Sequence, residues 1–217
     1  HNSIHHMPYT GLVVSGVRPH FFRMENRREC SRTIRWDEVG GVGEKPYDEL
    51  VKYLHSRHNV VEFNEVYRTM LTLGDGNGIY VSGTGPRNVV RRNYLHDILG
   101  YASRGAIRLD NHQNQTLVEG NVIENCVYAG ILLKGKNRLE NNVIANMAQL
   151  SQPGSHEVEV CGHIVLRSPS GVSTGSRIER NVLVHGGGPH PFYGVRRSGP
   201  LTELRVDYNL YFTPENM

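Results

Sequence analysis

The amino-acid sequence predicts an all-β coil in which each turn is built from three short parallel strands. Three observations favour this fold class: a recurring Asn-x-aliphatic unit, a recurring glycine-led unit with alternating apolar residues, and a high content of bend-forming residues. Of the 217 residues, 24 are glycine and 18 are asparagine, which argues against a helical bundle and for many tight bends. The chain contains no run of about 18 apolar residues, so no transmembrane helix and no membrane partner are expected.

The Asn-x-aliphatic unit predicts the first strand position and the bend before it. Its copies begin at Asn2, Asn64, Asn93, Asn121, Asn142, Asn181 and Asn209. From Asn64 onward, successive copies lie 29, 28, 21, 39 and 28 residues apart, which sets the length of one turn. Asparagine tolerates left-handed backbone, and its amide can bond the same amide one turn away. We therefore expect these asparagines to form a structural ladder and not a ligand site.

Two further units complete each turn. A lead-in strand ends at each bend, as in the segments 59–64, 88–93, 116–121, 137–142 and 176–181. A glycine-led unit follows after a loop, at 11–16, 78–83, 105–110 and 130–135, with weaker copies at 162–167 and 194–199. Apolar residues alternate within these units, which is the period of a strand and not of a helix. Their inward side chains are predicted to stack into a core with turns about 4.8 Å apart.

The repeat predicts one domain over residues 1–217 that is interrupted by insertions. Residues 17–57 break the rhythm, and Leu50, Val51 and Leu54 lie at helical spacing within them, so we expect a loop with a short helix. Smaller insertions are expected at 151–160 and 185–192. Because the repeat already runs at residue 2 and still runs near residue 209, we expect a fragment of a longer protein or a mature chain cut inside its fold. If the chain is a fragment, the remainder of the parent chain would be a partner.

The pattern NVVRRNYLH…GAIRLD…TLVEGNVIENCVYAGILLKGKNRLENNVIAN resembles the right-handed parallel β-helix proteins. That superfamily includes pectate-lyase-like enzymes, several glycoside hydrolases and phage tailspikes, and the closest similarity in pattern is to the β-helix glycoside hydrolases. The resemblance implies a right-handed parallel β-helix, a polysaccharide or oligosaccharide substrate, and an extracellular or periplasmic location. Because this fold carries several activities, the residues of the site must decide among them.

Two acidic motifs indicate where catalysis would occur. GDGNGIY at 74–80, followed one turn later by AIRLDN at 106–111, is similar to β-helix glycosidases in which carboxylates from adjacent turns act together. This resemblance implies catalysis by Asp75 and Asp110. Glycoside hydrolysis needs two such groups about 5–10 Å apart, whereas a fully extended path would separate them by about 26 Å. The pair therefore requires the Asp75 loop to fold back over its strand, and Asp97 is a rival partner.

Strand alternation predicts which side chains face outward beside these acids. One outward column comprises Ser82, Asp110, Lys134 and Arg167, and its neighbour comprises Tyr80, Arg108, Leu132 and Val165. An aromatic residue, a carboxylate and several cations on one face suit a polysaccharide groove, and we take Tyr80, Arg108, Lys134 and Arg167 as substrate-binding candidates. The alternative is a solvated face with an Asp110–Lys134 ion pair. His96 is a further candidate for binding sugar hydroxyls and could equally be a surface residue. His112, next to Asp110, could orient that acid or donate to the substrate.

Three functions remain open at this stage. The first is a glycoside hydrolase that uses Asp75 with Asp110 or Asp97. The second is a lyase or epimerase for uronic-acid polymers, with Lys134, Arg167 and Arg108 as base and carboxylate neutraliser. The third is a non-catalytic glycan-binding β-helix.

Composition narrows the partners and cofactors that we expect. The outward column holds one acid followed by cations, which departs from the acidic clusters of calcium-dependent lyases. The sequence has neither a CxxC nor an HExxH motif, so no metal and no cofactor are expected. The net charge of +3 is too mild to indicate nucleic acid.

Overall fold

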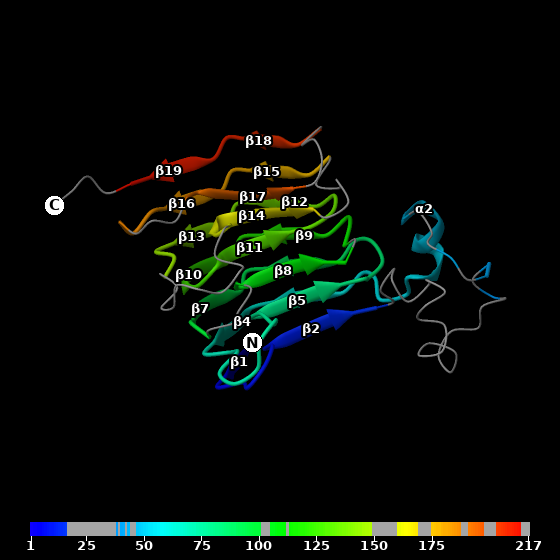
Figure 1. Ribbon diagram of the computed structural model, residues 1–217, viewed down its shortest axis with the longest axis horizontal. Coiled ribbons are helices and arrows are strands. Elements are labelled where there is room, and N and C mark those ends of the chain that lie inside the picture. Colours follow the sequence, from blue (N-terminus) through cyan, green and yellow to red (C-terminus); the bar gives the residue numbers. More distant parts are fainter. Residues whose placement is uncertain are drawn as a thin grey trace.

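The structure is a computed structural model that describes residues 1–16, 38, 40–41, 43, 47–100, 105–111, 113–148, 160–168, 175–187, 191–197 and 203–213. Most of the 17–57 insertion and of the 151–160 insertion, and His112, lie outside the described residues. A short helix, α2 (Tyr47–Leu50), followed by a 3₁₀ turn at Val51–Tyr53, occurs where helical spacing predicted one. Leu50 and Leu54 are buried, and α2 lies beside the stack of strands (Figure 1).

The strands form three parallel sheets, and each turn of the chain contributes one strand to each sheet. Sheet A contains β1 (Asn2–His5), β4 (Asn64–Tyr67), β7 (Tyr94–Ile98), β10 (Val122–Cys126), β13 (Val143–Ala145), β16 (Val182–Val184) and β19 (Leu210–Phe212). Sheet B contains β2 (Leu12–Ser15), β5 (Ile79–Ser82), β8 (Ile107–Asp110), β11 (Ala129–Leu133), β14 (Gly162–Ser168) and β17 (Tyr193–Arg197). Sheet C contains β3 (Val60–Glu62), β6 (Val89–Arg91), β9 (Leu117–Glu119), β12 (Arg138–Glu140), β15 (Arg177–Glu179) and β18 (Arg205–Asp207).

The turns stack in sequence order, from β1 and β2 at one end of the molecule to β18 and β19 at the other (Figure 1). The three predicted strand positions are therefore confirmed: the lead-in strands form sheet C, the Asn units sheet A and the glycine-led units sheet B. Every pairing is parallel and in register, as between Ile79 and Ile107 and between Ile107 and Ile131. This stacking explains why the sequence repeats once per turn.

The core is the column of aliphatic side chains that point inward from all three sheets. The glycine-led units supply Ile79, Val81, Ile107 and Leu109, which are fully buried as the alternation predicts. Glycine is needed at the second residue of β11, where neighbouring atoms approach closely: a Cβ at Gly130 would lie 2.5 Å from Ile144 Cγ2 and 2.7 Å from the His163 carbonyl oxygen.

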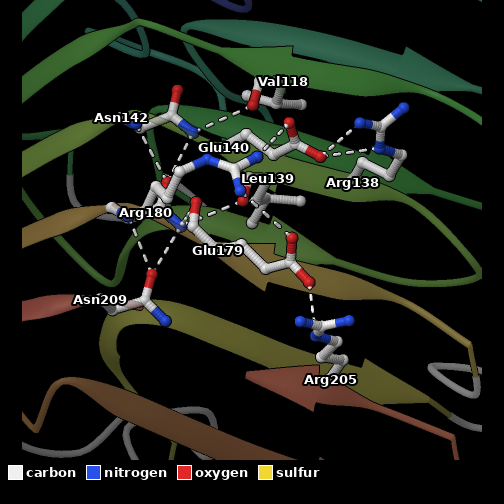
Figure 2. Close-up of polar contacts among 10 residues, drawn as sticks. Val118, Arg138, Leu139, Glu140, Asn142, Glu179, Arg180, Arg205 and Asn209 are labelled. Atoms are coloured by element: carbon white, nitrogen blue, oxygen red, sulfur yellow. Dashed lines mark hydrogen bonds and ion pairs between the residues drawn. The ribbon is translucent and has the colours of Figure 1, made fainter. Parts of the chain in front are cut away.

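The predicted asparagine ladder runs the length of the bend between sheets C and A. Each amide nitrogen donates to the amide oxygen of the next asparagine, over 2.8–3.0 Å, through Asn2, Asn64, Asn93, Asn121, Asn142, Asn181 and Asn209. Figure 2 shows the part of this ladder around Asn142 and Asn209. From Asn64 onward, the residue before each ladder asparagine takes positive φ, as do Arg92, Asn141 and Arg180. The ladder thus satisfies buried amides at a bend that all turns share.

A second polar ladder lies at the bend between sheets B and C, where the sequence pattern gave no single residue type. Asn88 accepts from the Asn59 amide at 2.9 Å, and Asn137 accepts from the backbone N–H of Thr116 at 2.9 Å. The backbone N–H of Asn137 in turn donates to Ser176 Oγ at 3.1 Å. This ladder positions the first residue of each sheet C strand.

Candidate active site on sheet B

The outer face of sheet B carries the two predicted columns in the predicted register. Tyr80 pairs with Arg108, Arg108 with Leu132, and Leu132 with Val165 across successive strands. In the neighbouring column, Ser82 pairs with Asp110. Lys134 follows directly after β11, and its backbone N–H donates to the carbonyl of Leu109 at 2.9 Å. The chemistry-bearing residues of three turns therefore meet on one face.

This face is more enclosed than an open groove, because several of the residues that face outward from sheet B are buried. Ser82, Leu132 and Val165 are fully buried, and Arg108 and Asp110 are nearly so. Leu132 and Val165 form a small apolar cluster with Tyr128 and Ala129, against which Val160 packs. Tyr128 and Val160, which lie between strands of sheets A and B, thus cover part of the sheet B face, which period-2 alternation alone does not reveal.

Arg108 contacts both Asp75 and Asp110, the two acids that the sequence analysis predicted as a pair. Its Nη1 donates to Asp75 Oδ1 at 2.8 Å, and its Nη2 forms an ion pair with Asp110 Oδ2. Two hydrogen bonds of about 3 Å each, with one guanidinium between them, place the carboxyl oxygens no more than roughly 8 Å apart. This separation is within the range of glycosidase carboxylate pairs.

The loop before β5 folds back as the pairing requires. Asp75 takes a left-handed backbone with φ of +58°, and its carbonyl oxygen accepts a hydrogen bond from the Tyr9 hydroxyl at 3.1 Å. Gly76 follows it, and a Cβ there would lie 2.4 Å from Met70 Sδ and 2.5 Å from Thr10 Oγ1. The glycine therefore lets the loop pass close to the preceding turn and return Asp75 to the sheet B face.

The two carboxyls differ strongly in environment. The Asp75 side chain is 67 % exposed, whereas those of Arg108 and Asp110 are 8 % and 3 % exposed. Asp110 forms an ion pair with Lys134 and accepts hydrogen bonds from the Tyr80 hydroxyl at 3.1 Å and the Asn111 backbone N–H at 2.8 Å. Asp110 is thus a buried carboxylate held by two cations and two further donors.

These contacts set the ionisation of the site. Burial works against the charged form of Asp110, but the nearby charges of Arg108 and Lys134 outweigh it and lower the pKa of this carboxyl. For Lys134, burial lowers the pKa; the Asp110 charge opposes this effect, and the charges of Arg108 and Arg167 add to it. Asp110 is therefore the ionised acid, and Lys134 gives up its proton more readily than an ordinary lysine.

Asn111 is a member of this site that the sequence reasoning missed. Its side-chain amide donates to Ser82 Oγ at 2.9 Å and to the Tyr80 hydroxyl at 3.3 Å. It takes φ of +47°, which turns the chain at the end of β8. The signal was present in the sequence, because asparagine directly after a strand favours this left-handed backbone.

Asp97 and His96 lie in a different network, on sheet A. His96 Nδ1 lies 3.0 Å from Asp97 Oδ2, and the Asn125 amide donates to Asp97 Oδ1. The hydrogen bond with His96 lowers the pKa of Asp97, and Asn125 adds to this effect. His96 stacks on Tyr67 with ring centroids 4.8 Å apart. Among the described residues, no contact joins Asp97 to Asp75 or Asp110, so the structure brings the pair together without Asp97.

The described residues contain no group of three or more His, Cys, Asp or Glu side chains arranged to hold a metal ion. Cys126 is buried, and burial raises the pKa of its thiol to about 12, so it is an inert core residue. No helix among the described residues is long and apolar enough to span a membrane.

Comparison with known proteins identifies the family. A model described as "Right handed beta helix region" matches residues 1–148 and, in an overlapping second match, residues 49–194. No curated protein and no solved structure gives a significant match to the chain. The family match spans most of the sequence and agrees with three in-register parallel sheets, so the chain belongs to the right-handed β-helix family and folds as a right-handed parallel β-helix.

Proposed function

We propose that this β-helix is a glycoside hydrolase that cleaves an extracellular or periplasmic polysaccharide with Asp75 and Asp110. The observation that carries the proposal is the Arg108 bridge between these two carboxyls on the outer face of sheet B. Hydrolysis of a glycosidic bond requires one carboxyl group that protonates the leaving oxygen and a second that stabilises or attacks the sugar carbon. The two acids supply this pair from adjacent turns of the coil.

The environments of the two acids assign their roles. Asp110 is held ionised by Arg108 and Lys134, so it provides the negative charge that stabilises the positive charge developing at the anomeric carbon. Asp75 is the exposed acid that a sugar can reach, and it provides the proton as the glycosidic bond breaks. A water molecule then adds to the sugar carbon and returns a proton to Asp75.

Asp75 must first be released from Arg108 in order to act as an acid. Because Asp75 is mostly exposed, its pair with Arg108 contributes at most about 1 kcal/mol, and a bound sugar can replace it. Arg108 then remains paired with Asp110, because that ion pair is buried, whereas Asp75 is exposed.

A second candidate function is a lyase or epimerase for uronic-acid polymers, and the lowered pKa of Lys134 favours it. A lysine that deprotonates readily can remove the proton next to the uronate carboxylate. Arg108 and Arg167 would then neutralise that carboxylate. In this case the two aspartates hold the cations in place and do not react.

The test is a product assay with neutral polysaccharides and with uronate polymers. A hydrolase releases reducing ends without a new ultraviolet-absorbing group, and a lyase produces an unsaturated, ultraviolet-absorbing sugar. We expect reducing ends alone, and a loss of about 10²-fold or more in Asp75→Asn. The matched control is Asp48→Asn, an exposed carboxyl on α2. Full activity in Asp75→Asn would reject the hydrolase proposal, and an unsaturated product that depends on Lys134 would replace it with the lyase.

A further inference from the structure

A basic groove lies on a different part of the coil, where the chain passes from sheet B into sheet C. Its volume is about 610 Å³, and it spans the first residues of β6, β9, β12 and β15. Its cationic lining residues are Arg87, Lys136, Arg138 and Arg177. Val89 and Leu117 supply apolar lining between them. None of the residues of the sheet B site lines this groove.

Within the part of the chain that the structure describes, most of these cations have no anionic partner. Among the described residues, Arg87, Lys136 and Arg177 form no ion pair, and no acidic side chain lines the groove. Arg138 differs, because it pairs with Glu140 at 2.6 Å. Three exposed positive charges therefore face solvent from one concave surface, and each remains free to meet an external anion.

The acids near the groove, Glu140 and Glu179, form ion pairs with arginines other than Arg177 and Arg87. Figure 2 shows Glu140 between Arg138 and Arg180, and Glu179 next to Arg205. Arg180 pairs with Glu140 at 3.0 Å, and Arg205 pairs with Glu179 at 2.8 Å. Glu140 and Glu179 are almost fully buried by these contacts. Glu140 and Glu179 are thus neutralised by Arg138, Arg180 and Arg205, and they leave Arg87, Lys136 and Arg177 uncompensated.

The coil fixes the spacing of the groove cations. Arg138 and Arg177 are register partners on adjacent strands, which lie about 4.8 Å apart. Lys136 passes over Gly175, where a Cβ would lie only 2.8 Å from Lys136 Cε. Arg87 takes φ of +63° at the bend and is exposed. The groove cations therefore lie on three turns of the coil: Arg87 on the turn of β6, Lys136 and Arg138 on the turn of β12, and Arg177 on the turn of β15.

We propose that this groove is a non-catalytic binding site for an acidic polysaccharide, whose repeated anionic groups pair with the repeated cations. Among the described residues, no aromatic side chain lines the groove, so it offers no stacking surface for nucleobases or for neutral sugars. The choice of a glycan over other polyanions rests on the proposed function of the sheet B site. Binding here would hold an acidic chain on the coil while the sheet B site acts on a polysaccharide.

The test compares two variants that lose the same number of charges. The groove variant carries Arg87→Gln, Lys136→Gln and Arg177→Gln, all at exposed positions without ion pairs. The control variant carries Lys52→Gln, Arg68→Gln and Arg92→Gln, which are exposed positions outside the groove. Binding to polygalacturonate, to neutral dextran and to single-stranded polyuridylate is measured at low and at high salt.

We expect wild type and control to bind polygalacturonate more tightly than dextran or polyuridylate, and to weaken with salt. The groove variant should lose about tenfold in affinity for polygalacturonate, because each exposed charge contact contributes about two- to threefold. Equal losses in both triple variants, no loss in the groove variant, or tighter binding of polyuridylate would overturn the proposal. Asp75→Asn should bind polygalacturonate as wild type does. The binding measurement therefore tests the groove independently of whether the hydrolase assignment is correct.

Discussion

Arg108 donates a 2.8 Å hydrogen bond to Asp75, a residue 33 positions earlier in the chain, from the preceding turn of the coil. The same guanidinium pairs with Asp110, two residues along its own strand. One buried cation thereby converts two carboxyls, distant along an extended chain, into a local pair. The chemistry that we propose for sheet B depends on this relationship.

Replacing Asp110 by asparagine should destabilise the protein strongly. The change leaves the buried Arg108 and Lys134 without their shared anion, at an expected cost of about 3–5 kcal/mol in unfolding free energy. Urea unfolding at neutral pH measures the difference. The matched control is Glu62→Gln, which breaks the more exposed Arg91–Glu62 pair and should cost at most about 1 kcal/mol. Similar costs for the two variants would contradict the buried network.

The same carboxyl should make stability sensitive to acid. The pKa of Asp110 is lower in the folded protein than its ordinary value, so its contribution is fully present above about pH 4. It is lost as the pH falls below that value towards the folded pKa. Wild type should therefore lose more unfolding free energy than Asp110→Asn between pH 5 and about pH 2. Parallel pH profiles for the two proteins would argue against an ionised Asp110.

The asparagine ladder should be most sensitive at its middle. Asn142 is fully buried, donates to the Val118 carbonyl and to Asn181, and accepts two hydrogen bonds from Asn121. We expect Asn142→Ala to cost about 3 kcal/mol, because several buried partners are left unsatisfied. Asn209→Ala, at the partly exposed end of the same ladder, should cost about 1 kcal/mol. Chemical denaturation compares them, and equal costs would reject the burial argument.

Gly130 should not tolerate a methyl group. A Cβ there would lie within 2.7 Å of both Ile144 Cγ2 and the His163 carbonyl oxygen, so Gly130→Ala should cost about 1–3 kcal/mol. The control is Gly120→Asn, where the nearest atom, Arg92 Cγ, is 3.7 Å from the Cβ position. Gly120 has φ of +61°, and Asn141 takes φ of +57° at the equivalent bend. Thermal unfolding should show a change within about 0.5 kcal/mol for the control.

Much of the fold was predictable because its determinants repeat. The Asn-x-aliphatic unit fixed the ladder through seven turns, and alternation around Ile107 and Leu109 fixed which face of sheet B points inward. The columns that align Tyr80 with Arg108 and Ser82 with Asp110 followed from the same alternation. Each repeated sequence unit occurs several times along the chain, so one irregular turn does not hide the pattern.

The features that escaped prediction occur once or depend on mixed residue types. The loop that returns Asp75 to sheet B is held by a hydrogen bond from Tyr9 in another turn, and the repeated sequence units do not encode this contact. The bridging role of Arg108 depends on that path, so the sequence predicts Arg108 only as a substrate-binding candidate. The bend before sheet C uses Asn88, Thr116 and Ser176 at equivalent places, which concealed both the second ladder and the basic groove beside it.

The measurement that tests the central claim most directly is the leaving-group dependence of the Asp75→Asn defect. The assay compares kcat/KM for glycosides of the cleaved sugar that carry either a poor or a good leaving group. If Asp75 is the proton donor, the variant should lose about 10²–10⁴-fold on the poor leaving group and less than about tenfold on the good one. An equal loss on both substrates, or no loss on either, would contradict the assignment of Asp75 as the acid.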